Sequence, residues 1–174
     1  MPYFVRPLAG CILLVLVLTK ADATELDLQR REAGHPATAT ARLWALAQSQ
    51  HWQVRQILAR NRKAPRNLLH KLATDNHPQV RIGVATNLKT AEKTFLLLAK
   101  DQDITVRSVV ARFEYVTVSA LRILQYDKAA EIRLEVAHNP NATQDILQNL
   151  SQDTHQEIRS IARLGLQRLK NQTN

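Results

Sequence analysis

Arginine and aspartate recur at a fixed spacing in this sequence, and their charges make them the first candidates for chemistry. Five arginines, each following Val or Ile, recur at one constant interval, at Arg55, Arg81, Arg107, Arg133 and Arg159. An aspartate stands six positions before each of the last four, at Asp75, Asp101, Asp127 and Asp153. An exposed arginine row would bind anions, whereas paired rows would satisfy turns and connect neighbouring units. We expect the paired arrangement, a structural ladder, in which the short aspartates also N-cap the following helices.

The densest positive charge lies within residues 60–71. Five cations stand there, namely Arg60, Arg62, Lys63, Arg66 and Lys71. Arg112 and His138 occupy the same repeat position as Arg60, so the positive edge would extend over several repeats. This edge is our candidate ligand-facing surface, and the alternative is a solvated face that has no dedicated ligand.

One copy of the repeat carries aromatic residues in the turn between its helices. Where other copies have Asn61, Asn87 and Asn139, this copy has Phe113, and Tyr115 follows shortly after it. Exposed rings would form a docking point for a partner. Alternatively, the turn is locally altered and its rings fold into the core, which is the usual place of lone aromatics.

The sequence holds no recognisable catalytic or metal-binding motif. His51, His77 and His155 share one repeat position, but stacked helices lie about 8–10 Å apart, too far for two imidazoles to reach one metal ion. There is no GxSxG, HExxH or paired-carboxylate pattern. We therefore expect no enzymatic activity, no cofactor and no metal.

Residues 1–23 have the form of a secretory signal peptide. Arg6 precedes an apolar run from Leu8 to Leu18, and Ala21-Asp22-Ala23 has the small-x-small form of a cleavage site. Cleavage would remove the single cysteine and leave a chain indifferent to an oxidising compartment. We predict a periplasmic or secreted protein with no membrane span after processing. The alternatives are an uncleaved inner-membrane anchor and a buried apolar helix of a cytosolic protein.

The 26-residue period predicts the fold of residues 24–174. In each unit, apolar residues such as Val54, Ile57 and Leu58 fall on one face of a short helix, and Leu68, Leu69 and Leu72 on one face of a second. Helices this short are marginal alone, so the units must stack. We predict an all-α, right-handed α-solenoid of five two-helix repeats that start near residues 28, 54, 80, 106 and 132, with a capping helix at 158–170.

The repeat resembles the bacterial variant leucine-rich repeat and its HEAT-like relatives. The resemblance covers residues 28 to about 169 and is plain in IRLEVAHNPNATQDILQNLSQD, residues 132–153. It implies a solenoid that serves as a binding scaffold, some second helices that are 3₁₀ in part, and an Arg/Asp ladder like that of HEAT proteins. The cysteine cluster of some variant leucine-rich repeat proteins is absent, so no iron–sulfur role is implied.

The net charge of +9 favours acidic partners. We therefore expect an exported scaffold whose basic surface binds an acidic protein or peptide. The alternative is a HEAT-like protein that binds the DNA backbone, with or without base-repair chemistry, and the export signal counts against it. A structural subunit of an envelope complex is a third possibility.

Overall fold

The computed structural model describes the backbone of residues 9–172 and the side chains of residues 22–171. This range contains eleven helices and no strand, so the prediction of an all-α fold is confirmed. The helices are α1 (Ala9–Gly34), α2 (Thr40–Leu46), α3 (Trp52–Arg60), α4 (Arg66–Leu72), α5 (Pro78–Ala85), α6 (Glu92–Leu98), α7 (Ile104–Arg112), α8 (Val118–Leu124), α9 (Ala130–His138), α10 (Gln144–Leu150) and α11 (Gln156–Gln172).

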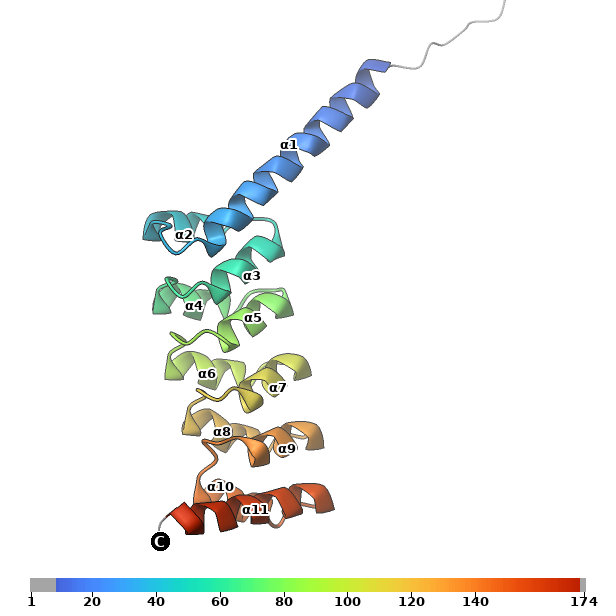
Figure 1. The fold of residues 1–174 in the computed structure, drawn as a ribbon. Helices are drawn as coiled ribbons and strands as arrows, with labels where there is room; N and C mark the ends of the chain where they lie inside the picture. The colour runs from blue at the N-terminus through green and yellow to red at the C-terminus, as the bar shows by residue number, and fades with distance from the viewer. Residues whose placement is uncertain (1–8, 173–174) are drawn as a thin grey trace, which may run out of the picture.

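Helix pairs lie one above the next along a column, with α1 projecting from one end and α11 closing the other (Figure 1). The odd-numbered helices α3 to α11 form one row, in which each contacts the next, and the even-numbered helices form the other. From α3 onward, the starts of the first-row helices are evenly spaced along the chain, and so are the starts of the even-numbered helices. In both rows this spacing equals the period of the sequence, so each repeat of the sequence is one helix pair.

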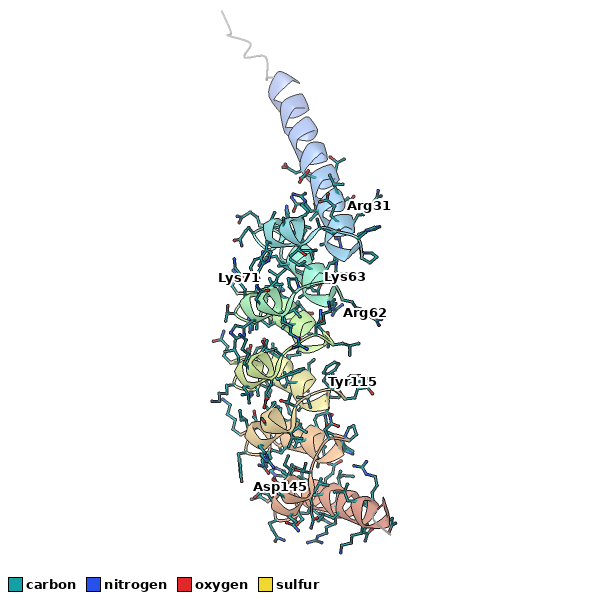
Figure 2. All side chains as sticks on the ribbon, turned by 90° about the vertical axis from the view of Figure 1, so that its left-hand side faces the viewer. Arg31, Arg62, Lys63, Lys71, Tyr115 and Asp145 are labelled. Atoms are coloured by element: carbon teal, nitrogen blue, oxygen red, sulfur yellow. The ribbon has the colours of Figure 1, made fainter. Side chains whose placement is uncertain are left out.

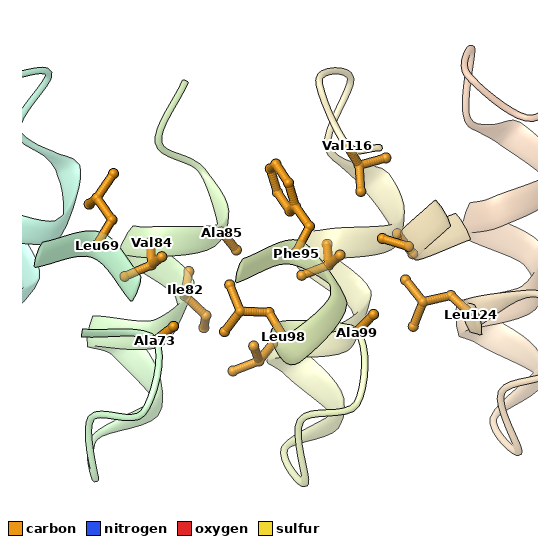
Figure 3. Packing of buried hydrophobic residues seen from close by; sticks show 14 of the residues in the cluster. Leu69, Ala73, Ile82, Val84, Ala85, Phe95, Leu98, Ala99, Val116 and Leu124 are labelled. Atoms are coloured by element: carbon orange, nitrogen blue, oxygen red, sulfur yellow. The ribbon is translucent and has the colours of Figure 1, made fainter. Parts of the chain in front are cut away.

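The core is a continuous apolar seam between the two rows (Figure 3). Each pair contributes a branched residue and an alanine from its first helix and leucines from its second, such as Val54 and Ala59 with Leu68 and Leu72, all at most 2% exposed. Burying one leucine contributes about 1.5–3 kcal/mol. A seven-residue helix is stable here because its apolar stripe is covered from both neighbouring layers.

Small residues permit the closest approaches between first-row helices. A Cβ atom added at Gly83 of α5 would lie 3.0 Å from the Cβ of Ala59 and 3.2 Å from the carbonyl oxygen of Gln56, both on α3. Contacts this short leave no room for a side chain. The alanine that recurs at residues 59, 85, 111 and 137 is completely or almost completely buried for the same reason.

The second helices of the repeats differ from the expectation that some of them are 3₁₀ in part. All five, from α2 to α10, are seven-residue α-helices without a 3₁₀ segment, so the expectation of partial 3₁₀ character in some of them is wrong. Each closes with an αR residue whose N–H bonds to a carbonyl of the last turn, as Ala73 does to Leu69. This tight closure lets the chain turn at once into the next first-row helix.

The N-terminal segment enters the fold as part of α1. The helix runs from Ala9 through the expected cleavage site and ends at Gly34, where Ala33 is fully buried. Arg6 and Leu8 of the expected signal peptide lie outside the described residues. Among residues 9–172, no helix combines the length and the apolar character needed to cross a membrane.

Candidate functional site

Each ladder arginine joins two turns that are one repeat apart in sequence. Arg81 donates from Nε and Nη2 to the two carboxylate oxygens of Asp101, at 2.7 and 2.8 Å. From Nη1 it donates to the carbonyl oxygen of Asp75, at 2.8 Å. One guanidinium therefore connects the turn before its helix to the turn after the next helix, and both charged side chains are only 7% exposed.

The same arrangement recurs in the neighbouring layers. The ion pairs Arg55–Asp75, Arg107–Asp127 and Arg133–Asp153 have Nε–Oδ2 distances of 2.6, 2.7 and 2.7 Å. Arg55 thus joins a ladder for which only the four later arginines, each preceded by an aspartate, were expected. Fork-shaped, charge-assisted pairs of this kind are the strongest side-chain hydrogen bonds, and they hold successive layers in register.

The aspartates do not N-cap the following helices, so that expectation is wrong. Each aspartate accepts a hydrogen bond from the backbone N–H two positions later, as Asp101 does from Asp103 at 2.9 Å. The cap position of α7 is Asp103 itself, which accepts from Thr105 N–H. The ladder aspartate shapes the turn, and a different residue begins the helix.

The ladder perturbs the proton affinity of its members in the direction that stabilises both charges. The pKa of Arg107 is raised, chiefly by its hydrogen bond to Asp127. Burial by itself would raise the pKa of Asp127, but the hydrogen bonds from Arg107 and the N–H of Ala129 outweigh it and lower that pKa. The pKa of Asp153 is held well below its usual range, mainly by the hydrogen bond from Arg133.

The two ends of the ladder differ from its middle. At the N-terminal end, Gln29 and Ser49 replace arginine and aspartate, and Ser49 Oγ donates to Gln29 Oε1 at 2.7 Å. At the C-terminal end, Arg159 donates from Nη1 to the carbonyl oxygens of Asp153 and Thr154, at 2.7 and 2.9 Å. No acidic side chain in the described part of the chain pairs with Arg159, although the other four arginines each have one.

A second ladder, made by asparagines, runs along the other edge. Asn87 donates from Nδ2 to the carbonyl oxygens of Ala59 and Asn61, at 2.7 and 3.0 Å, and accepts from Lys89 N–H. Asn61 and Asn139 repeat these bonds, and all three side chains are buried. The sequence showed that asparagine recurs at this position, but it indicated only that the first helix of the repeat ends there. The hydrogen bonds from these asparagines to carbonyl oxygens of the preceding repeat could not be inferred from the sequence.

The predicted basic residues lie on more than one edge. Arg62 and Lys63 lie in the turn between α3 and α4, and Figure 2 shows them on the same edge as Arg31 and Tyr115, whereas Lys71 lies on the opposite edge. Lys71 Nζ is 5.7 Å from the centroid of the Trp44 ring, a cation–π geometry. The expected single surface is therefore divided, because a helix separates Lys71 from the turn.

The cations at the turn are not paired with acidic side chains of the described residues. Arg60 and Arg66 flank Arg62 and Lys63, all four are exposed, and none makes an ion pair with a residue that the structure describes. Residues 33–74 contain no aspartate or glutamate. Arg112, in the same repeat position as Arg60, is 3.7 Å from Glu135 and is thus partly neutralised.

Of the two aromatic residues in the turn between α7 and α8, one packs against the core and the other lies on the surface. Phe113 is half-buried against the core, with its ring centroid 6.1 Å from that of Phe95. Tyr115 lies 5.7 Å from Phe113 but is 60% exposed. The same edge also carries Leu88, which is 54% exposed. Beyond the cations, this edge thus offers apolar surface to a partner.

The remaining polar clusters have structural partners. The rings of Trp52 and His77 stack with centroids 4.0 Å apart, and His77 caps α5 by accepting from Gln79 N–H. Within residues 22–171, no group of three or more His, Cys, Asp or Glu side chains could hold a metal ion. An open groove of about 470 Å³ lies between two ladder turns and is lined by Arg81 and Asp101, which already bind each other.

No protein-family model matches this chain, and no curated protein matches its sequence significantly. Function must therefore be argued from the surfaces described above.

Proposed function

We propose that this protein is an exported, non-enzymatic scaffold that binds an acidic protein or peptide along the edge formed by Arg60, Arg62, Lys63 and Arg66. These four residues are named the basic edge. In this proposal the stacked helix pairs are a right-handed α-solenoid of five variant leucine-rich or HEAT-like repeats. The constant spacing of the helices and the two side-chain ladders support that assignment.

The observation that carries the proposal is the contrast between paired and unpaired cations. Ladder arginines such as Arg81 are buried and bonded to aspartate, so their charge is neutralised locally. The basic edge has four exposed cations in a stretch without acidic residues. A concentrated positive field of this kind raises the association rate of an acidic partner and favours it over neutral ones.

Exposed apolar residues on the same edge supply the rest of the contact. Leu88 and Tyr115 are more than half exposed and belong to the two turns that follow Arg62 and Lys63 along the stack. Aromatic anchors contribute more binding energy than peripheral charges, which act mainly on the rate of encounter. An acidic segment that also carries an apolar side chain fits this edge best.

The experiment is a binding titration by fluorescence anisotropy with a labelled deca-glutamate peptide. We expect saturable binding that weakens as the salt rises from about 50 to 300 mM, because the contact is electrostatic. Arg62→Glu together with Lys63→Glu should weaken it by about tenfold or more, roughly 1.4 kcal/mol. The matched control, Lys100→Glu with Lys128→Glu, makes the same charge change in exposed turns elsewhere and should have a much smaller effect.

Two results would contradict the proposal. Equal losses in the two double variants would mean that only net charge matters and that the edge is a solvated face. Tighter binding of duplex DNA than of the peptide, with the same dependence on Arg62 and Lys63, would instead favour the nucleic-acid alternative.

Export is the other part of the proposal, and it rests on the sequence of residues 1–23. Cleavage after Ala23 would shorten α1 to residues 24–34 and keep buried Ala33, which packs in the core. The intact mass of the protein from its native cells tests this. Loss of residues 1–23 from an envelope or secreted fraction is expected, and a full-length soluble cytosolic product would refute export.

A further inference from the structure

The open end of the Arg/Asp ladder has the features of a binding site for a carboxylate. In the four layers from Arg55 to Arg133, Nη1 donates to the carbonyl oxygen of the residue six positions earlier, at 2.7–2.8 Å. This contact places the opposite edge of the guanidinium, Nε and Nη2, toward the next turn. There it binds both oxygens of an aspartate.

Arg159 makes the hydrogen bond to the carbonyl oxygen six positions earlier but has no aspartate partner in the described part of the chain. Its Nη1 donates to the carbonyl oxygen of Asp153 at 2.7 Å, the same contact that orients the other four arginines. The Nε and Nη2 edge has no acidic partner among the described residues, and Glu157, two positions away, makes no ion pair with it there. The Arg159 side chain is thus positioned as in the other layers, and it is partly exposed.

The course of α11 differs from that of the other first-row helices. Helices α3, α7 and α9 have their C-cap residues at Asn61, Phe113 and Asn139, and a turn and a second helix follow. In α11 the corresponding residue is Gly165, and the helix continues to Gln172. A Cβ at Gly165 would lie 2.9 Å from Leu147 Cδ1, so glycine lets α11 cross closely over α10. The turn that ends the first helix in the other repeats is therefore absent at residue 165.

We propose that Arg159 is a carboxylate-binding site, occupied by an aspartate or glutamate side chain of a partner protein that packs against this end of the stack. The four filled layers show what fits: a planar carboxylate that receives two hydrogen bonds from Nε and Nη2. Such two-point pairing distinguishes carboxylates from neutral amides. The inference rests on the proposed function only in assigning the carboxylate to a protein partner, because the site itself is remote in sequence from the basic edge.

The test is an NMR titration that observes the Nε–Hε signals of the arginines. The probes are the blocked pentapeptide Gly-Ser-Asp-Ser-Gly and its Asn counterpart. We expect the Arg159 signal to shift saturably with the Asp peptide, while the Asn peptide leaves it in place and the four paired ladder arginines do not respond. The backbone amide signals of Asp153 to His155, the turn that Arg159 contacts, should shift with the Asp peptide in the wild-type protein and stay in place in Arg159→Lys, because a single ammonium cannot make the two-point contact. Arg163→Lys, on the exposed face of the same helix, should preserve these shifts.

Other outcomes overturn the proposal. A response of Arg163 and Arg168 equal to that of Arg159 would indicate general charge attraction, and inorganic phosphate that binds more tightly than the Asp peptide would reassign the ligand. Deca-glutamate binding at the basic edge should be unchanged in Arg159→Lys. An unresponsive Arg159 with intact deca-glutamate binding refutes this site alone, whereas the reverse result refutes the proposed function alone.

Discussion

Replacing Asp127 by asparagine should separate the unfolding of the C-terminal layers from that of the N-terminal ones. Asp127 receives two hydrogen bonds from Arg107, and its carbonyl oxygen accepts one from Arg133, so it lies at a junction of the ladder. Asparagine keeps the size of the side chain but removes the charge. The Arg107 guanidinium, 8% exposed, is then left without its counter-ion.

The size of the expected loss in stability follows from the burial of the Arg107 guanidinium. Removing one partner of a buried ion pair costs about 3–5 kcal/mol, and the lower end applies here because the pair lies near the surface. A loss of about 3 kcal/mol is a large part of the roughly 5–15 kcal/mol that stabilises typical proteins. In stacked repeats each layer contacts only its neighbours, so the loss is felt mainly by the layers adjoining Asp127.

The two tryptophans make this loss of coupling measurable. Trp44 and Trp52 are the only tryptophans, and both lie in the N-terminal layers, on α2 and α3. In urea, circular dichroism reports all helices while tryptophan fluorescence reports these layers. We expect coincident transitions for the wild-type protein. In Asp127→Asn, the circular dichroism transition should begin at lower urea than the fluorescence transition.

The control is Asp145→Asn. Asp145 pairs with Arg122 at 3.1 Å, but both side chains are more than half exposed, so the loss of this pair should leave the urea transitions almost unchanged. Equal effects of the two variants, or transitions that stay coincident in Asp127→Asn, would refute the reasoning that the buried ladder couples the layers.

Two further predictions concern the ladders. Asn87→Ala should lower the free energy of unfolding in urea by about 2–3 kcal/mol, because two buried carbonyl oxygens lose their hydrogen-bond donor. The control, Asn171→Ala, changes an exposed position and should leave the stability unchanged. An unchanged stability of Asn87→Ala would contradict the role of Asn87 in the ladder. The aspartates Asp127 and Asp153 have pKa values below that of an unfolded aspartate, about 3.9. Their contribution is therefore complete above about pH 4 to 5 and lost as the pH falls through the folded values. Tm should be steady from about pH 7 to 5 and fall below about pH 4, and a fall already complete at about pH 5 would contradict this.

The sequence determined the all-α class and the placing of the helix pairs, because a 26-residue period with apolar residues at helical spacing has few other solutions. It also identified the Arg and Asp columns, since both types recur in fixed register. It could not identify their bonding partners. Arg81 binds the carboxylate of Asp101, in the following repeat, and only the carbonyl of Asp75, the aspartate six positions before it.

The tertiary structure decided which residues of a dense sequence run share a surface. Lys71 is close to Lys63 in sequence, but α4 carries it to the opposite edge, beside Trp44. Phe113 and Tyr115 also differ in their surroundings, because the Phe113 ring packs toward Phe95 whereas the Tyr115 ring faces solvent. The open edge of Arg159 also required the structure, because the path of α11 decides whether another turn follows. Periodicity fixes what recurs along the chain, while side-chain direction and helix path fix what meets in space.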